Sequence, residues 1–437
     1  MRATVIGGGL AGCEAAWQLA RRGIQVELYE MKPGKKTPAQ LLDTMAELVC
    51  SNSLRSDRLS NAVGLLKVEM RKLDSLILRV ADETAVPAGG ALAVDREHFS
   101  AGVDRAVRSH PGITLREEEV TRVPQEGPVI IATGPLTSDA LSQEIGRMEG
   151  LGLLHFYDAA APIVTADSLN MDKVFRMSRY ERGEDYLNCP MNREEYMAFW
   201  QALQSAHTVP VHGFEEKAVF EGCMPIESMA KRGEMAIAFG PLKPVGLRDP
   251  RTGKEPFAVV QLRRDNQEGS LYNLVGFQTR LTFPEQRRVF SMIPGLEHAE
   301  FARLGVMHRN TFLNSPGFLD DTYQVIRRPG LYFAGQITGV EGYVESAGSG
   351  LLAGITLAAR LQGREPSRFS GRTALGAMAR YVSAPNRNFQ PMNCAFGLID
   401  PLEVAPGQRK IRNKQQRYEA ISHRALSEID EILQANP

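Results

Sequence analysis

Short apolar runs, a glycine-rich turn and a helical stretch alternate over the first thirty residues. An apolar run over residues 2–6 leads into a G-x-G-x-x-G turn at residues 7–12, and a second run ends at Glu30. This order predicts a β-α-β unit that binds a dinucleotide. Gly7 permits the turn, Gly9 lets the backbone approach a pyrophosphate, and Gly12 lets helix and strand pack closely. The helix N-terminus offers N–H groups to the phosphates. The predicted site comprises Gly7, Gly8, Gly9, Leu10, Ala11, Gly12 and, for the adenosine ribose, Glu30.

The pattern changes twice along the rest of the chain. Apolar spacing predicts helix over 62–82, and Asp95 is placed to cap a helix that runs through Arg108. Strands are predicted near 113–115 and 129–132. From about residue 156, alternating segments at Phe156–Ile163, Met235–Phe239 and Phe257–Leu262 indicate an antiparallel sheet with separate helices. The pattern predicts an α/β fold, in which an α+β insertion domain over 156–304 separates a first part, 1–155, from a second part, 305–437.

Two later segments favour FAD over NAD. One is an apolar strand that ends in Ala132-Thr133-Gly134, and the other runs from Gly330 through Gly335-Gln336 into a glycine-bearing helix. They resemble the FAD segments of glutathione-reductase-type flavoproteins, most of which have Asp where Gln336 stands. The resemblance implies FAD contacts at Ala132, Thr133, Gly134, Gly335, Gln336, Gly348 and Gly350. The sequence has no second G-x-G-x-x-G in comparable context, so NAD(P)H is expected to bind only transiently.

Composition excludes several classes of protein. The chain has 437 residues, 43% of them apolar and 23% charged, with a formal net charge of zero. These values are typical of a globular protein and provide no global field for nucleic acid. We expect no membrane span and no signal peptide. The five cysteines are widely spaced without a zinc pattern, so a reducing cytoplasm and no metal site are expected.

The C-terminal region is the one segment with patterned charge. It carries a basic cluster followed by a helix with an apolar stripe, and the cluster consists of Arg409, Lys410, Arg412, Lys414 and Arg417. Such a cluster is either a solvated surface or a contact for RNA phosphates. The sequence alone leaves both interpretations open.

Two cysteine motifs extend the resemblance to one family. Cys50 lies in Glu47-Leu-Val-Cys-Ser-Asn-Ser-Leu-Arg-Ser-Asp57, and Cys223 lies in Phe220-Glu-Gly-Cys-Met-Pro-Ile-Glu227. With further motifs at 186–191, 307–311, 339–346 and 385–393, nearly the whole chain resembles the folate- and FAD-dependent tRNA (uracil-5-)-methyltransferases. The resemblance implies 5,10-methylenetetrahydrofolate as carbon donor and reduced FAD as methylene carrier and reductant. It also implies NAD(P)H as electron source and a uridine in the T arm of tRNA as substrate.

The chemistry of this family explains why two thiols are needed. C5 of uracil is a poor nucleophile until a thiolate adds at C6, and a base must then remove the C5 proton. We expect Cys223 to be the nucleophile and Cys50 the base or a helper near the flavin, although the roles can be exchanged. Arg55 is a candidate for favouring the Cys50 thiolate. Cys13, Cys189 and Cys394 are expected to be structural.

A further motif is assigned to folate. The resemblance implies that His308 stacks on the folate ring and that Arg309 meets its glutamate tail. Asn310 and Tyr343 are expected to line the same pocket. The alternative is a surface histidine beside a solvated arginine.

Three other functions compete with this interpretation. They are the sister flavoprotein that modifies the wobble uridine of tRNA, an FAD oxidoreductase of a small molecule, and a flavin-containing RNA-binding protein without turnover. The Cys223 motif and the short segment after the last glycine-bearing helix favour the T-arm enzyme. The oligomeric state stays open, with a monomer favoured.

Overall fold

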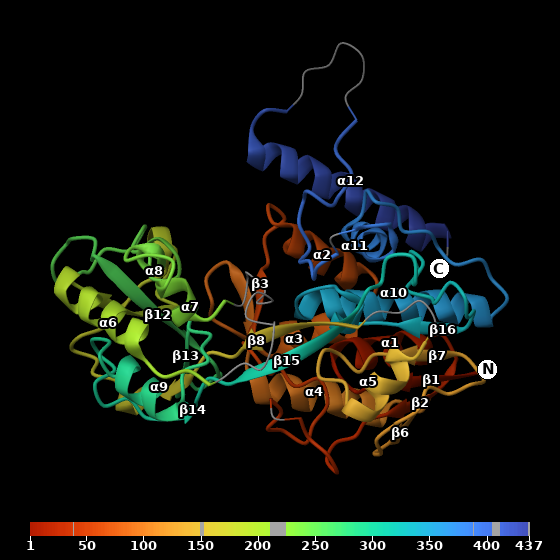
Figure 1. Cartoon of the computed structure of the whole chain (residues 1–437). Coiled ribbons are helices and arrows are strands. Elements are labelled where there is room, and N and C mark those ends of the chain that lie inside the picture. The colour runs from red at the N-terminus through yellow and green to blue at the C-terminus, as the bar shows by residue number, and fades with distance from the viewer. Residues whose placement is uncertain (38, 149–152, 210–223, 388, 404–410, 436–437) are drawn as a thin grey trace.

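The fold has two lobes joined by a pair of long strands (Figure 1). This computed structural model describes residues 1–37, 39–148, 153–209, 224–387, 389–403 and 411–435, with only the backbone for 153–159, 181 and 307–309. The larger lobe is built from the chain before β8 (Leu153–Ala159) and after β15 (Met307–Leu313). The smaller lobe has its own apolar core, formed by residues between Ala161 and Phe301. The two joining strands pair antiparallel along their whole length.

The larger lobe is organised around a five-stranded parallel sheet. Its strand order is β16-β7-β1-β2-β6, and the strands are β1 (Arg2–Ile6), β2 (Gln25–Tyr29), β6 (Ile113–Arg116), β7 (Val129–Ile131) and β16 (Leu331–Phe333). Helix α1 (Leu10–Ala20) connects β1 to β2, which confirms the β-α-β unit expected from the first thirty residues. The late strand β16 pairs with β7 in this sheet. The two segments expected to contact FAD, which continue into Ala132-Thr133-Gly134 and Gly335-Gln336, therefore lie side by side.

Helix α10 (Tyr343–Leu361) packs directly against α1. Small residues make this close approach possible, because a Cβ on Gly350 would lie 2.1 Å from the Ala11 carbonyl oxygen. A Cβ on Gly354 would lie 2.9 Å from the Ala15 carbonyl oxygen. The contact therefore sets the position of α10, whose N-terminus reaches the junction between the lobes.

The predicted helix over 62–82 is wrong as a single element. The chain forms α2 (Ala62–Lys72) and α3 (Leu76–Glu83), separated at Asp74, whose φ is +55°. Ser75 then caps α3 by accepting the Leu78 N–H. A side-chain cap competes with continued helix, which apolar spacing does not reveal. The Asp95 cap is confirmed, since its carboxylate accepts the His98 N–H at the start of α4 (Arg96–Ser109).

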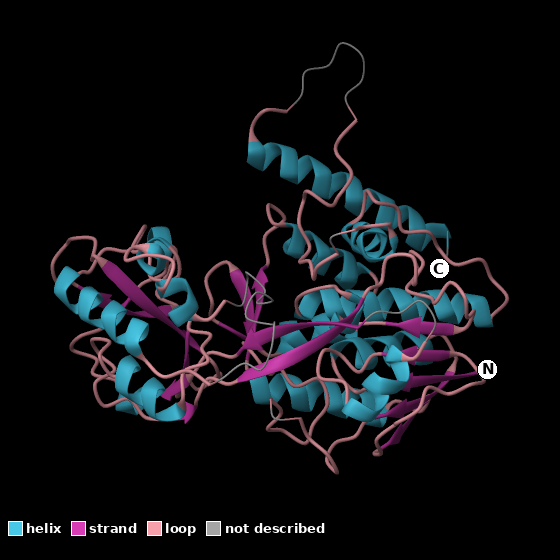
Figure 2. Ribbon diagram, viewed as in Figure 1, coloured by secondary structure: helices cyan, strands magenta, loops and turns pink. Residues whose placement is uncertain are grey.

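The smaller lobe contains a six-stranded sheet with order β10-β11-β12-β13-β9-β14. The strands are β9 (Ile163–Thr165), β10 (Phe175–Arg176), β11 (Tyr186–Met191), β12 (Ala258–Arg264), β13 (Leu271–Leu274) and β14 (Phe301–Arg303). Helices α6 (Arg193–Ser205) and α9 (Phe283–Phe290) lie on the side away from the larger lobe (Figure 2).

The strand predicted at Met235–Phe239 is wrong, because Ala236–Phe239 forms the short helix α8 after α7 (Ile226–Ala230). A segment of four or five residues is compatible with both the helical and the strand period, so tertiary packing decides which of the two forms.

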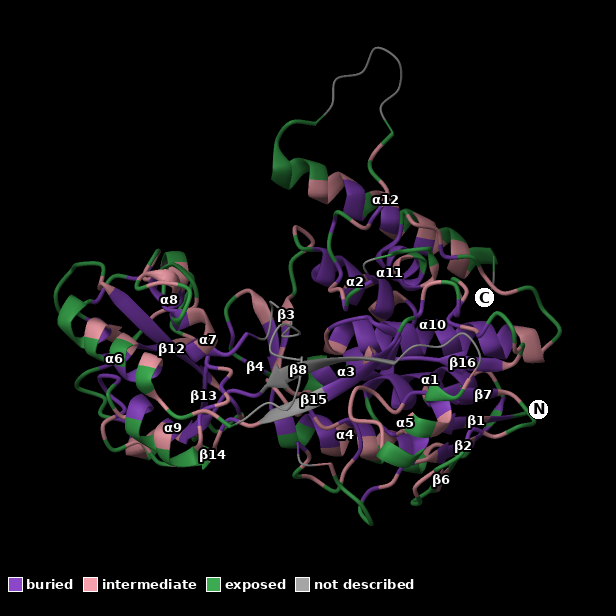
Figure 3. Cartoon of the chain, in the orientation of Figure 1, coloured by how far each residue is buried: buried purple, intermediate pink, exposed green. Residues whose placement is uncertain are grey.

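The remaining elements complete the larger lobe. One part is a three-stranded sheet of β3 (Ser53–Ser56), β5 (Ala91–Val94) and β4 (Ala85–Val86). The other parts are the helices α5 (Asp139–Gly146), α11 (Ala374–Ser383) and α12 (Lys414–Ala435). The predicted apolar stripe of α12 buries Ile421, Ala425 and Ile429 against the larger core, while its first turns stay exposed (Figure 3). Among the described residues, no helix is both long and apolar enough to span a bilayer.

Gly350→Ala tests the contact between α1 and α10. The new methyl group would overlap backbone that cannot move independently, so we expect a loss of about 1–3 kcal/mol in unfolding free energy. Gly397→Ala is the matched control, because a Cβ there meets open space and the residue does not need a positive φ. Denaturant unfolding of both variants measures the difference. Equal stability of the two variants would contradict this packing.

Candidate functional site

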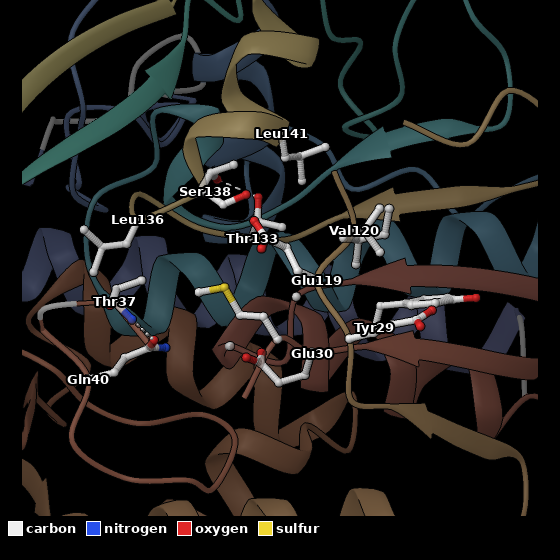
Figure 4. Close-up of a pocket in the computed structure, with 16 residues that line it drawn as sticks. Tyr29, Glu30, Thr37, Gln40, Glu119, Val120, Thr133, Leu136, Ser138 and Leu141 are labelled. Atoms are coloured by element: carbon white, nitrogen blue, oxygen red, sulfur yellow. Dashed lines mark hydrogen bonds between the residues drawn. The ribbon is translucent and has the colours of Figure 1, made fainter. Parts of the chain in front are cut away.

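One end of the candidate site is a cavity of about 100 Å³ at the carboxyl ends of β1, β2 and β7 (Figure 4). Gly7 has φ +103°, and a Cβ on it would lie 2.6 Å from the Ala132 carbonyl oxygen. Gly9 precedes α1 without a side-chain cap, and a Cβ on it would meet open space. The first N–H groups of α1 are therefore available to a phosphate group.

Glu30, Thr133, Ser138 and Leu141 all line this cavity (Figure 4). The two carboxylate oxygens of Glu30 accept the N–H groups of Gly8, at 2.7 Å, and Lys32, at 3.0 Å. Each oxygen keeps a second lone pair for a ribose hydroxyl. This acidic group, the open N–H groups and the glycine turn fit the adenosine and pyrophosphate parts of FAD.

The other predicted cofactor residues separate into two groups. Gln336 faces the junction of the lobes, where its Nε2 donates to Glu341 Oε2 at 2.6 Å. Gly335 has φ +88° and its N–H donates to Ser349 Oγ at 2.7 Å. Gly348 and Gly350 lie inside α10, where they allow close helix packing. Their burial away from the helix N-terminus gives these two residues a packing role.

A second cavity, of about 290 Å³, lies where the two lobes meet. Cys50, Gln336 and Tyr343 line it from the larger lobe. Arg263 and Asn273 line it from the smaller lobe, and Asn310 lines it from β15. The structure thus brings together Cys50, Asn310, Tyr343 and Gln336, which sequence reasoning selected from four separate motifs.

The backbone around Cys50 is held by Tyr343 at the start of α10. The Tyr343 hydroxyl accepts the N–H of Cys50 at 2.7 Å and the N–H of Ser51 at 3.1 Å. Burial, together with the charge of Cys50, raises the pKa of this hydroxyl. Tyr343 therefore stays neutral and fixes the position of the thiol.

Three arginines hold the same loop, residues 48–52, from other elements. Arg96 donates to the Leu48 carbonyl, and Arg303 donates to the Val49 carbonyl at 2.8 Å. Arg263 donates to Ser51 Oγ at 2.7 Å and to Asn52 Oδ1 at 3.0 Å. These three arginines carry no recognisable motif, so sequence reasoning missed them.

The charges at this junction are only partly balanced. Asp265 pairs with Arg96 at 2.9 Å, with both side chains buried. Burial lowers the pKa of Arg263 and of Arg303. Arg55 lines the same cavity as Cys50 and forms an ion pair with the buried Glu345. This carboxylate offsets part of the field that Arg55 exerts on the thiol.

Several predicted residues cannot be placed in this geometry. Cys223, Arg409 and Lys410 lie outside the described residues. His308 and Arg309 belong to β15, opposite Asp158 and Tyr157 of β8, but only their backbone is described. Arg412 precedes α12, Lys414 and Arg417 lie in its first turn, and all three are exposed. Lys414 and Arg417 approach the Tyr418 ring at 5.6 Å.

Three other cysteines and one cluster of candidate metal ligands do not line this cavity. Burial raises the pKa of Cys13, Cys189 and Cys394, which supports their structural role. Asp95, His98 and Glu268 place three ligand atoms within 4.8 Å of one another. Both Asp95 oxygens already accept backbone N–H groups, from His98 and Gln267. The cluster alone therefore does not define a metal site.

The parallel sheet, the glycine turn and the cavity beside a held thiol define a class, the FAD-binding Rossmann-type α/β flavoproteins. The family model described as "Glucose inhibited division protein A" matches residues 2–365. The chain belongs to this family.

Full-length relatives share the name "Methylenetetrahydrofolate--tRNA-(uracil-5-)-methyltransferase TrmFO". The relative from Bacillus licheniformis is 61% identical over 430 residues, which cover 98% of each chain. The relative from Lactobacillus johnsonii is 59% identical over 429 residues, covering 98% of this chain and 97% of that protein. The structure of Aquifex aeolicus GidA aligns with TM-score 0.69 and 17% identity, over 99% of this chain and 73% of that one. At that identity the similarity shows the fold alone.

Tyr343→Phe tests how the Cys50 loop is held. The change leaves two part-buried N–H groups without their acceptor, which costs about 1–3 kcal/mol per group. We expect a lower melting temperature and slower turnover. Tyr381→Phe is the control, since its hydroxyl donates to the Gln390 carbonyl at an exposed position. Stability and activity equal to those of Tyr381→Phe would contradict the holding role of Tyr343.

Proposed function

We propose that this protein methylates C5 of a uridine in tRNA, with 5,10-methylenetetrahydrofolate as carbon donor, FAD as bound cofactor and NAD(P)H as electron source. One observation carries the proposal. Cys50 lies in a cavity between the lobes, in a loop whose backbone is held by Tyr343 and three arginines. The full-length relatives named for this reaction support it.

FAD would be held at its adenosine end by Glu30 and the glycine turn, and at its other end near Gln336. When bound, FAD supplies the redox chemistry that converts a methylene group to a methyl group. The chain's own contribution is to bind and orient the reactants and to move the proton from C5.

The two cysteines divide the substrate chemistry. Cys223 is proposed to add to C6 of the uracil, and Cys50 to take the C5 proton. The exchanged assignment is the alternative. His308, Arg309, Asn310 and Tyr343 are proposed to contact folate. Asn310 supports this part, because both polar atoms of its buried carboxamide lack a hydrogen-bond partner beside the cavity.

The finer features of the proposal concern the substrate and the organisation of the chain. The target is proposed to be the T-arm uridine, with Arg409, Lys410, Arg412, Lys414 and Arg417 contacting tRNA phosphates. Residues 156–304 are proposed to be an insertion domain within a glutathione-reductase-type FAD domain of 1–155 and 305–437. The separate apolar core between Ala161 and Phe301 supports this division. A cytoplasmic location would fit the reduced thiols.

Transfer of a labelled carbon tests the function. The flavin-loaded protein is incubated with unmodified tRNA, NAD(P)H and folate carrying a labelled methylene group, and the digested RNA is analysed. We expect label in 5-methyluridine, at least 100-fold less with Cys50→Ala or Cys223→Ala. Cys189→Ala is the matched control, because this buried thiol lies in the core of the smaller lobe.

The alternatives predict other outcomes. Absence of label with the unaltered, flavin-loaded protein that still binds tRNA would overturn the proposal. Product at the wobble position would then favour the sister enzyme. NAD(P)H oxidation without RNA product would favour an oxidoreductase.

A further inference from the structure

The smaller lobe places at the reaction cavity a buried side chain whose amide nitrogen has no hydrogen-bond acceptor in the protein. Asn273 lies in β13, is 2% exposed and lines the cavity that also contains Cys50. Its Nδ2 is buried without a hydrogen-bond acceptor. A buried donor without a partner destabilises the fold, so its presence in a cavity indicates a ligand that accepts its hydrogen bond.

The strand pattern explains why Asn273 faces the cavity. Tyr272 and Leu274, its neighbours in β13, belong to the core of the smaller lobe. Side chains alternate along a strand, so Asn273 points to the opposite face, toward the larger lobe. Arg263 of β12 is its register partner and lies on that same face.

Other polar side chains on this face have partners in the protein. Asn188 donates to the Met177 carbonyl at 2.9 Å and accepts from Gln261 Nε2 at 3.0 Å. Arg263 is bound to Ser51 and Asn52. Asn273 differs from these residues, although it has the same burial and the same sheet as Asn188.

The position of Asn273 relates it to the thiol. Cross-strand neighbours have Cβ atoms about 5 Å apart. Arg263 reaches Ser51, and Asn273 and Cys50 line the same cavity. In a uracil bound with its C5 proton at the Cys50 thiol, the next ring atom, C4, carries a carbonyl group. This carbonyl would lie within reach of the Asn273 carboxamide.

We propose that Asn273 donates its Nδ2–H to O4 of the target uracil, and that this contact both selects uridine and stabilises the addition of thiolate at C6. This inference rests on the proposed function. It assigns the substrate base to Asn273, on the side of the smaller lobe. Asn310, whose neighbour Thr311 donates its N–H to the Pro135 carbonyl of the larger lobe, is left to folate.

The electron balance of the addition shows why a donor is needed at O4. The thiolate lone pair forms the S–C6 bond, the C5=C6 π pair becomes the C4=C5 bond, and the C4=O π pair moves onto O4. One negative charge thus passes from sulfur to O4, without any oxidation. A donor already placed at O4 stabilises this charge. Cytosine carries an amino group at C4, which would meet the same N–H as donor against donor.

Asn273→Ala separates a catalytic role from a structural one. Loss of one such donor lowers turnover by about 10²–10³-fold. The melting temperature should stay equal or rise, because the change removes an unpartnered buried group. Asn188→Ala is the matched control, and we expect it to lower the melting temperature while turnover of the folded enzyme stays normal. Flavin content should be unchanged in both variants.

The atom contacted is tested with an altered substrate. A T-arm RNA with 4-thiouridine at the target position replaces O4 by sulfur, a weaker acceptor. We expect the unaltered enzyme to be slower on this RNA than on the uridine RNA, and Asn273→Ala to show little difference between the two. An equal thio effect in both enzymes, or normal turnover of Asn273→Ala on uridine, would overturn the proposal.

The outcomes distinguish this inference from the proposed function. Failure of the unaltered enzyme to methylate the uridine RNA would reject the function itself. Loss of the folate-dependent step without a change in the thio effect would place Asn273 at folate and reject its role at the base.

Discussion

The structure depends on how residues 48–52 are held between the two lobes. Arg303 and Arg263 reach this loop from the smaller lobe, and Arg96 and Tyr343 reach it from the larger lobe. Carbonyls and N–H groups buried at a junction need partners, and charged donors satisfy carbonyls strongly. The hydrogen bonds that position Cys50 are therefore among those that join the lobes, so the geometry of the thiol and the docking of the lobes are coupled.

Helix α10 connects this junction to the nucleotide end of the site. Its N-terminal residue, Tyr343, touches the Cys50 loop, and its middle packs through Gly350 on α1, which follows the glycine turn. The α1–α10 contact is so close that one helix cannot shift without the other. The contact between α1 and α10 therefore sets the distance between the dinucleotide end of the site and the Cys50 thiol. A fixed distance suits a reaction in which both ends of a long cofactor must be held in place.

The junction also shows how stability and function are balanced. Most of its polar groups are satisfied by one another, as in the Arg96–Asp265 pair and the Asn188–Gln261 bond. Asn273 and Asn310 are exceptions that face the cavity. Proteins retain such groups where a ligand completes their hydrogen bonds, and the stability of the free protein is lower as a result.

Sequence by itself determined the dinucleotide unit, the Asp95 cap and the apolar stripe of α12, because each depends on residues close together in the chain. It placed a strand at Met235–Phe239 and one helix over 62–82, where local periodicity competes with capping and packing. Only the tertiary structure decided that Arg55 pairs with Glu345, and that Arg96, Arg263 and Arg303 hold the thiol loop. Only it set Asn273 in the cavity that Cys50 also lines. These contacts join residues far apart in sequence, and their partners follow from strand register and lobe docking, which no local pattern encodes.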